Sequence, residues 1–182
     1  MTRGAEAAAY LNEVIDGKTV GFGDSETMLS MGLFALLATH NEVHDPMHRP
    51  EGETFRETAR KTLLTDVFLT SLNAMSETGE LVNIDGTGNR VAGSLFGHEK
   101  VYFVVSLSKL CPTLDDALFR ARNVAAPQNA ARHGFQTPCA IKGDRCYDCS
   151  ANNRICNALV VHYRKMRGIR MEVVLIRETL GL

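Results

Sequence analysis

Apolar positions along the chain recur with two different spacings. Helical spacing predicts helices, and short apolar runs between polar breaks predict strands. The run 100–106 (KVYFVVS) is almost wholly apolar, as expected of a strand buried on both faces. Helices are predicted over residues 5–15, 26–38, 54–64, 91–96 and 113–124, and strands over 18–22, 66–71, 81–84, 100–106, 160–163 and 171–176.

Within the second predicted helix, Leu29, Leu33, Leu36 and Leu37 are expected to form one buried stripe. Pro127 is expected to end or restart the helix that begins near Thr113. Because strands alternate with helices, the pattern favours an α/β fold with a parallel sheet. We predict a single domain over residues 1–182, with a cysteine-rich segment over 137–157.

Composition and charge exclude several classes of protein. The chain has 182 residues and a net charge of −1, so bulk electrostatics favour neither nucleic acid nor an anionic membrane. No apolar stretch is long enough to span a bilayer, and the N-terminus lacks the pattern of a signal peptide. We therefore expect a cytoplasmic protein without membrane or nucleic-acid partners.

Four of the five cysteines lie within eighteen positions, in the pattern C-x6-C-x2-C-x6-C. Four thiolates can close a tetrahedral zinc site or hold a [4Fe–4S] cluster. In a reducing compartment such a group binds metal more often than it forms disulfides, although free thiols or a redox disulfide stay open. The four predicted metal ligands are Cys139, Cys146, Cys149 and Cys156.

A first glycine loop, residues 21–27, joins a predicted strand to a helix. Its glycines, Gly21 and Gly23, allow a ligand to approach the backbone, and the helix start offers N–H groups to an anion. The loop matches no nucleotide-binding motif, so no nucleotide cofactor is indicated. A simple turn capped by its own side chains is the alternative. The remaining candidate ligand contacts here are Asp24, Ser25 and Thr27.

A second glycine loop, residues 85–90, leads from a predicted strand into a helix. Asp85 is a candidate base or hydroxyl acceptor, and Arg90 can pair with a carboxylate or phosphate. A turn in which Asp and Asn bond their own backbone is the alternative. Backbone contacts to the ligand are expected at Gly86, Thr87, Gly88 and Asn89. We predict that the two loops together bind a small anionic metabolite.

Three histidines, His40, His44 and His48, lie four residues apart. Helical spacing would place them on one face, but Pro46 breaks that helix. We therefore interpret them as solvated loop histidines rather than as a metal site.

Several runs resemble the LUD domain family, the lactate-utilisation domain. The similarity covers nearly the whole chain, and its cysteine-bearing branch matches around Cys139 and Cys156. The family often has glycine where Asp24 stands. The runs that carry the resemblance are VGFGDSET at 20–27, DVFLTS at 66–71, DGTGNRVA at 85–92, RNVAAP at 122–127 and ETLG at 178–181.

This resemblance implies a mainly parallel sheet with helices on both faces, similar to sugar-phosphate isomerases and CoA transferases. It also implies iron–sulfur oxidoreductase subunits as partners. Our preference for an iron–sulfur cluster over zinc at the four cysteines rests on this resemblance. Two alternatives to metabolite binding stay open: a redox accessory protein using the cysteines, and an isomerase or acyl/CoA transferase. Whether the chain is an enzyme or forms a homo-oligomer also stays open.

Overall fold

The computed structural model describes residues 1–181, which divide into two compact units. The first unit contains Met1–Ser71, Asn89–Ser108 and Lys165–Gly181, and the second contains Leu72–Gly88 and Lys109–Arg164. The prediction of a single domain over 1–182 stays a prediction. No helix within residues 1–181 is long and apolar enough to cross a membrane.

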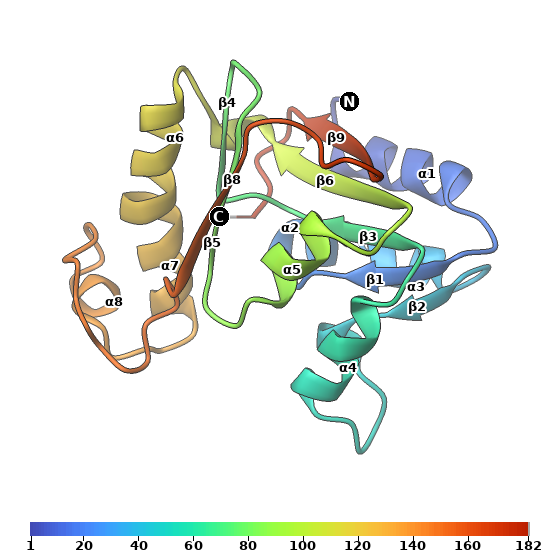
Figure 1. Ribbon diagram of the computed structural model, residues 1–182, viewed down its shortest axis with the longest axis horizontal. Coiled ribbons are helices and arrows are strands. Elements are labelled where there is room, and N and C mark those ends of the chain that lie inside the picture. Colours follow the sequence, from blue (N-terminus) through green and yellow to red (C-terminus); the bar gives the residue numbers. More distant parts are fainter. Residues whose placement is uncertain (182) are drawn as a thin grey trace. The chain divides into compact units, whose positions relative to one another are not determined.

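A five-stranded sheet forms the centre of the first unit (Figure 1), with the strand order β2-β1-β3-β6-β9. All four strand pairings are parallel, which confirms the predicted α/β class. β6 is buried almost throughout, as its apolar sequence predicts. β2 was not predicted. The strands are β1 Thr19–Phe22, β2 Glu42–His44, β3 Val67–Thr70, β6 Lys100–Ser106 and β9 Arg170–Ile176.

Helices cover both faces of this sheet. Leu11 of α1 and Leu33 of α3 pack in one cluster with Val20, Leu69 and Val104, so α1 and α3 cover one face. Side chains alternate between the faces of a strand, so Phe68 points to the other face, where it meets α5. The helices are α1 Gly4–Val14, α2 Glu26–Ser30, α3 Leu33–Leu37, α4 Phe55–Thr62 and α5 Asn89–Leu95, with a 3₁₀ turn η1 Pro46–His48.

The single helix predicted over 26–38 is wrong, because the chain forms two short helices there. Gly32 separates them with a φ of +62°, a left-handed conformation that glycine adopts without steric cost. Because of this break, the four leucines no longer lie on one face of a single helix. Leu33 and Leu37 are fully buried, whereas Leu29 and Leu36 are 44% and 41% exposed.

The far face of the first sheet is packed around the ring of Phe68. This ring stacks on His98, with the ring centroids 4.9 Å apart. A Cβ added at Gly93 of α5 would lie 2.5 Å from the ring, and one added at Gly23 would lie 2.8 Å from it. This side chain of β3 therefore requires glycine on two neighbouring segments.

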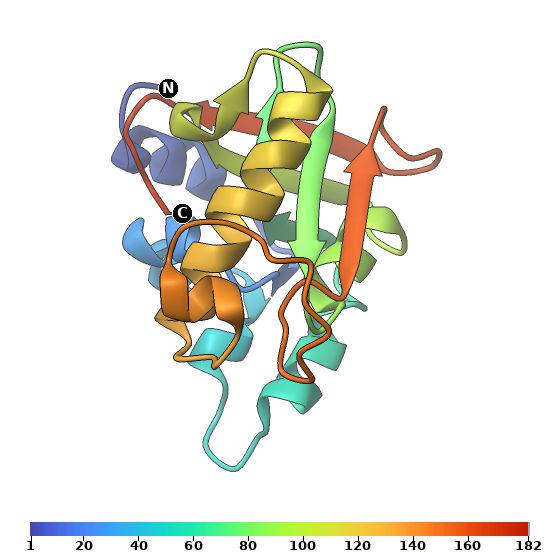
Figure 2. The ribbon, with the colours of Figure 1, turned by 90° about the vertical axis from the view of Figure 1, so that its left-hand side faces the viewer.

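The second unit has its own four-stranded sheet, in the order β7-β4-β5-β8. β5 pairs antiparallel with β4 and β8, and β4 pairs parallel with β7. Figure 2 shows α6 lying beside this sheet. The sequence did not predict β4 or β7. The elements are β4 Ala74–Ser76, β5 Leu81–Asp85, β7 Leu110–Cys111, β8 Ala158–His162, α6 Leu114–Arg120, α7 Ala126–Arg132, α8 Pro138–Lys142 and a 3₁₀ turn η2 Leu107–Lys109.

A new helix, α7, begins beside Pro127, which is one of the two outcomes that the sequence predicts for the helix that begins after Thr113. Thr113 caps α6 as predicted, accepting a hydrogen bond from the backbone of Asp116. A π-helical turn, Ala121–Ala125, then joins α6 to α7, and Pro127 falls in the first turn of α7. A proline is tolerated there because the first N–H groups of a helix lack intrahelical partners.

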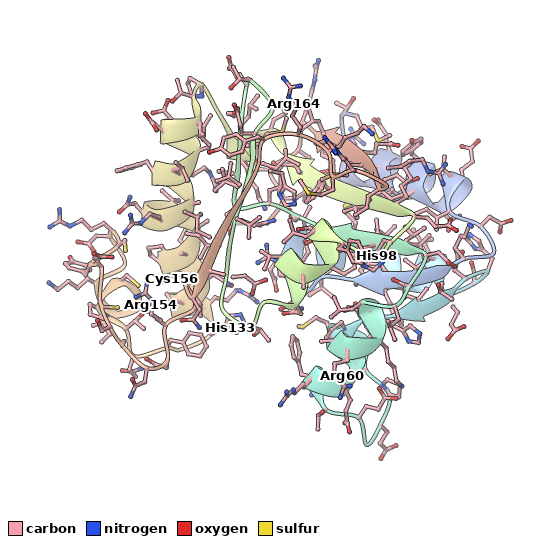
Figure 3. All side chains as sticks on the ribbon, viewed as in Figure 1. Arg60, His98, His133, Arg154, Cys156 and Arg164 are labelled. Carbon is pink, nitrogen blue, oxygen red and sulfur yellow. The ribbon has the colours of Figure 1, made fainter. Side chains whose placement is uncertain are left out.

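We expect His98 to make the stability of the protein depend on pH. Its side chain, labelled in Figure 3, is 3% exposed. Its Nδ1 donates to the carbonyl of Thr65 at 2.6 Å, and its buried Nε2 has no partner among residues 1–181. Burial lowers the pKa of His98 below its usual value. The unfolded chain therefore takes up the proton first, and the free energy of unfolding should fall as pH drops below about 6.5.

Chemical denaturation of the wild type between about pH 8 and pH 5 measures this dependence. His98→Phe keeps an aromatic ring on Phe68 and removes the titration, so its stability should vary less with pH over this range. His133→Gln, a change at an exposed histidine, is the control. An unchanged pH dependence in His98→Phe would contradict the assignment.

Gly93→Ala should destabilise the protein through overpacking. The added methyl group would lie 2.5 Å from Phe68 Cζ, and both residues are held by buried backbone. We expect the free energy of unfolding to fall by about 2–3 kcal/mol. Ala92→Ser, on the exposed face of the same helix, should change it by only about 0.5 kcal/mol. Equal stabilities of the two variants would contradict this packing argument.

Candidate functional site

All four clustered cysteines line one cavity in the second unit, with a volume of about 220 Å³. Cys139 lies on α8, Cys146 and Cys149 lie in the loop that follows, and Cys156 lies just before β8. Each is a half-buried free thiol. The structure therefore brings together the predicted metal ligands, although within residues 1–181 no three side chains of His, Cys, Asp or Glu form a group that could hold an ion.

Local capping places Cys139. Thr137 accepts a hydrogen bond from the backbone N–H of Ala140 and thereby caps α8, and Pro138 occupies the first position of the helix. The hydroxyl of Thr137 also lies 3.3 Å from Cys139 Sγ. Gly143 ends the helix with a φ of +71° and sends the chain into the cysteine loop.

A tight turn joins Cys146 to Cys149. Asp148 has a φ of +48°, and its backbone N–H donates to Cys146 Sγ at 3.4 Å. The side chain of Asn123 accepts from the backbone N–H of Cys146 at 3.1 Å and fixes this turn to the π-helical segment. Arg122 adds an ion pair with Asp148 at 3.2 Å. The turn is therefore folded so that a backbone donor points at a thiol.

Arg154 links Cys149 to Cys156, and Figure 3 shows Arg154 beside Cys156. Its Nε donates to Cys156 Sγ at 3.1 Å, and its Nη1 donates to the carbonyl of Cys149 at 2.7 Å. The hydrogen bond to Cys156 raises the pKa of Arg154 above its usual value. The guanidinium of Arg154 therefore lies directly against one of the four predicted metal ligands.

The second glycine loop anchors the cysteine segment. Asn157 donates its backbone N–H to the carbonyl of Asp85 and its side-chain amide to the carbonyl of Gly86, both at 3.0 Å. A Cβ at Gly86 would lie 3.0 Å from the backbone of Ile155. Gly86 is thus needed for close packing against the cysteine segment, a role that differs from the predicted ligand contact.

Asp85 stabilises its own turn. Its Oδ1 accepts the backbone N–H groups of Thr87 and Gly88, each at 3.1 Å, as in the turn that we considered as the alternative. Asn89 and Arg90 follow in α5, which belongs to the first unit. The catalytic roles of Asp85 and Arg90 stay predictions.

The first glycine loop lies in the first unit and also has structural reasons for its residues. A Cβ at Gly21 would lie 2.6 Å from the carbonyl of Thr62, so α4 packs directly on β1 there. Ser25 caps α2 by accepting from the backbone of Met28, and buried Thr27 donates to the carbonyl of Leu180. Asp24 has a φ of +43°, the conformation that glycine favours. Anion binding by this loop stays a prediction.

Sequence reasoning assigned no role to Thr137, Asn123 or Asn157, which support the cysteine segment. Thr137 carried a recognisable signal, since a threonine before proline is typical of a helix start. Asn123 and Asn157 carried none, because their partners are distant in the sequence.

The sequence model of the LUD domain matches residues 1–176. A crystal structure of a DUF162 family protein from Deinococcus radiodurans is similar with a TM-score of 0.40 and 12% identity, over 95% of this chain and 94% of that one. Ribose 5-phosphate isomerase from Plasmodium falciparum is similar with a TM-score of 0.38 and 16% sequence identity. The match covers 60% of this chain and 52% of that one.

No curated protein matches the chain. Structural similarity at TM-scores below 0.5 does not establish a shared activity. The match of the family model covers almost the full length of the sequence, and by this match the chain belongs to the LUD domain family.

Proposed function

We propose that the second unit binds a metal centre through Cys139, Cys146, Cys149 and Cys156, and that the chain serves lactate utilisation as a redox accessory protein. The observation that carries this proposal is the convergence of all four thiols on one cavity. Within one short segment, Cys139 lies on α8, Cys146 and Cys149 lie in the loop that follows, and Cys156 lies just before β8, yet all four line the same cavity.

The surroundings of the sulfur atoms fit a thiolate-bound centre. Three of the four have a polar neighbour within hydrogen-bond distance: the hydroxyl of Thr137, the backbone N–H of Asp148 and the guanidinium of Arg154. Hydrogen bonds to cysteine sulfur offset the negative charge of thiolates and tune the reduction potential of clusters. Half-buried cysteines can turn about χ1 towards a shared centre at small cost.

The type of centre decides the chemistry. An iron–sulfur cluster held here would supply one-electron transfer, whereas zinc with four thiolates would only fix the loop. In either case Arg154 contributes positive charge beside the thiolates and holds the loop through the carbonyl of Cys149. The apolar side chains of Ile84, Pro127 and Leu159 line the same cavity and reduce the access of water.

Binding of an anionic metabolite by the glycine loops is supported less well by the geometry. Gly21, Gly23 and Gly86 are required by packing, and Asp85 Oδ1 is occupied by its own turn. A phosphate or carboxylate ligand, and the isomerase or acyl-transferase activity that could follow, remain weaker candidates than the metal centre.

Metal and sulfide analysis of anaerobically purified protein tests the proposal. The wild type should contain either a cluster, seen as iron, sulfide and a broad visible absorption band, or one zinc ion. Changing each cluster cysteine to Ala should remove most of the metal, because a missing thiolate opens the coordination shell. Cys111→Ala is the matched control, since Cys111 is packed in the core of the second unit.

The control variant should keep the full metal content of the wild type. Protein that holds no metal after anaerobic purification and reconstitution, or that holds the same amount after loss of all four cysteines, would contradict the proposal. Equal loss in Cys111→Ala would show that the metal depends on folding alone.

Arg154→Met should weaken retention of the centre without unfolding the protein. The change removes the donors to Cys156 Sγ and to the carbonyl of Cys149. We expect metal transfer to a chelator to become roughly tenfold faster, since lost outer-shell partners typically cost 10–100-fold in metal affinity. Arg145→Met, in the same loop but stacked on Tyr147, is the control and should not change this rate. Equal rates for both variants would argue against a role for Arg154.

A further inference from the structure

The helix beside the cysteine cavity changes its hydrogen-bond pattern halfway along. α6 and α7 continue one another through the π-helical turn Ala121–Ala125 (Figure 1). The backbone N–H of Ala121 donates to the carbonyl of Ala117, four residues back, whereas that of Ala126 donates to the carbonyl of Ala121, five residues back. The turn therefore contains one residue more than an α-helical turn. Such turns are rare and occur frequently at functional sites.

Two features of the sequence fix this turn. Ala117, Ala121 and Ala126 pack in one cluster with the strands of the second sheet, and their spacings are four and five residues. In a regular α-helix five residues correspond to a rotation of about 140°, which would turn Ala126 away from the sheet. Pro127 acts in the same direction, because its ring would clash with the carbonyl four residues before it in a regular helix.

Inside the π-helical turn, Asn123 reaches the ligand turn, residues 146–149 of the cysteine segment. Its Oδ1 accepts the backbone N–H of Cys146 at 3.1 Å, and its Nδ2 donates to the carbonyl of Phe119, also at 3.1 Å. Both ends of the amide are used, so the orientation of the side chain is determined. Asn123 thus joins the backbone of one predicted metal ligand to a helix that is packed on the second sheet.

Arg122 makes the other side-chain contact from this turn, an ion pair with Asp148 at 3.2 Å. The two side chains are 50% and 85% exposed, so water screens the pair and it contributes little. The hydrogen bond of Asn123 is therefore the stronger of the two links between the helix and the ligand turn.

We propose that Asn123 is a positioning residue for the metal centre and that the π-helical turn directs it at the ligand turn. This inference rests on the metal-binding function proposed above. Ligands that are already held near their bound positions lose less freedom when a metal binds, so preorganisation raises affinity. Through Cys146, Asn123 holds the half of the centre that Cys146 and Cys149 supply, before any metal is present.

Zinc binding to the full-length, reduced, metal-free protein tests the role of Asn123, with zinc as the probe because four thiolates bind it whatever the native centre. Asn123→Leu has a similar volume and lacks both hydrogen bonds. Its zinc affinity, measured by competition with a chromophoric chelator, should fall about tenfold, since lost outer-shell partners typically cost roughly 10–100-fold. Asn129→Leu, on α7, alters an amide that accepts from the exposed Arg132 and should leave the affinity unchanged.

Hydrogen exchange in the metal-free protein separates positioning from general stability. Without its acceptor, the backbone N–H of Cys146 should exchange about tenfold faster in Asn123→Leu, through local opening of the ligand turn. The buried amides of β5 should keep their exchange rates. An unchanged rate at Cys146, or the same acceleration in β5, would overturn the positioning role.

A deletion tests the π-helical turn itself. Removing Val124 and introducing Pro127→Ala gives the buried alanines a spacing of four throughout, so the helix can be α-helical from end to end. Zinc affinity should fall, and adding Asn123→Leu to this variant should have no further effect, because Asn123 then no longer faces Cys146. A further tenfold loss would overturn the role of the turn. Failure of the variant to fold would do the same, because packing alone would then require the turn.

Two results distinguish this inference from the function on which it rests. Wild-type protein that binds neither zinc nor a cluster would overturn both. Wild-type protein that binds zinc with the same affinity as Asn123→Leu would overturn this inference alone.

Discussion

The antiparallel pairing of β8 with β5 is the interaction on which the cysteine cavity depends. The five pairs from Leu81↔His162 to Asp85↔Ala158 fix the chain that leaves the cysteine loop. Asn157 extends this pairing by two hydrogen bonds to Asp85 and Gly86. Because Cys156 directly precedes Asn157, its thiol is placed by the sheet, while Cys139 is placed by α8. A loop with little regular structure thus acquires two fixed ends.

Elements with a strong local signal could be predicted from the sequence. β6 is predicted with the observed bounds because an apolar run of this length is compatible with few other environments. Thr113 caps its helix as expected, since the cap depends on residues three positions away. The predictions failed where the outcome depends on distant contacts. β4 and β7, with three and two residues, are too short to show periodicity and exist only through pairing.

For the candidate sites, too, local patterns could be interpreted from the sequence, whereas contacts between residues distant in the sequence could not. The spacing of the cysteines indicated a shared site, because four thiols in one short segment have few other uses. The glycines were more ambiguous, because glycine allows close approach of a ligand and of another part of the protein equally well. Gly21 lies against Thr62, and Gly86 lies against Ile155, neither of which is near in sequence. The contact of Asn123 with Cys146 escaped prediction, because the two residues are 23 positions apart.

Residues with strained backbone conformations lie beside candidate ligand contacts in both units. Among residues 1–181, Asp24 and Asp148 are the only residues other than glycine with positive φ. Each lies next to a proposed ligand contact, Asp24 beside Ser25 and Asp148 beside Cys149. Aspartate tolerates the left-handed region better than most residues, but glycine would adopt it without steric cost. Strain persists only where the surroundings impose it. At Asp148 the imposed conformation points a backbone N–H at a thiol, so there the strain has an identifiable use.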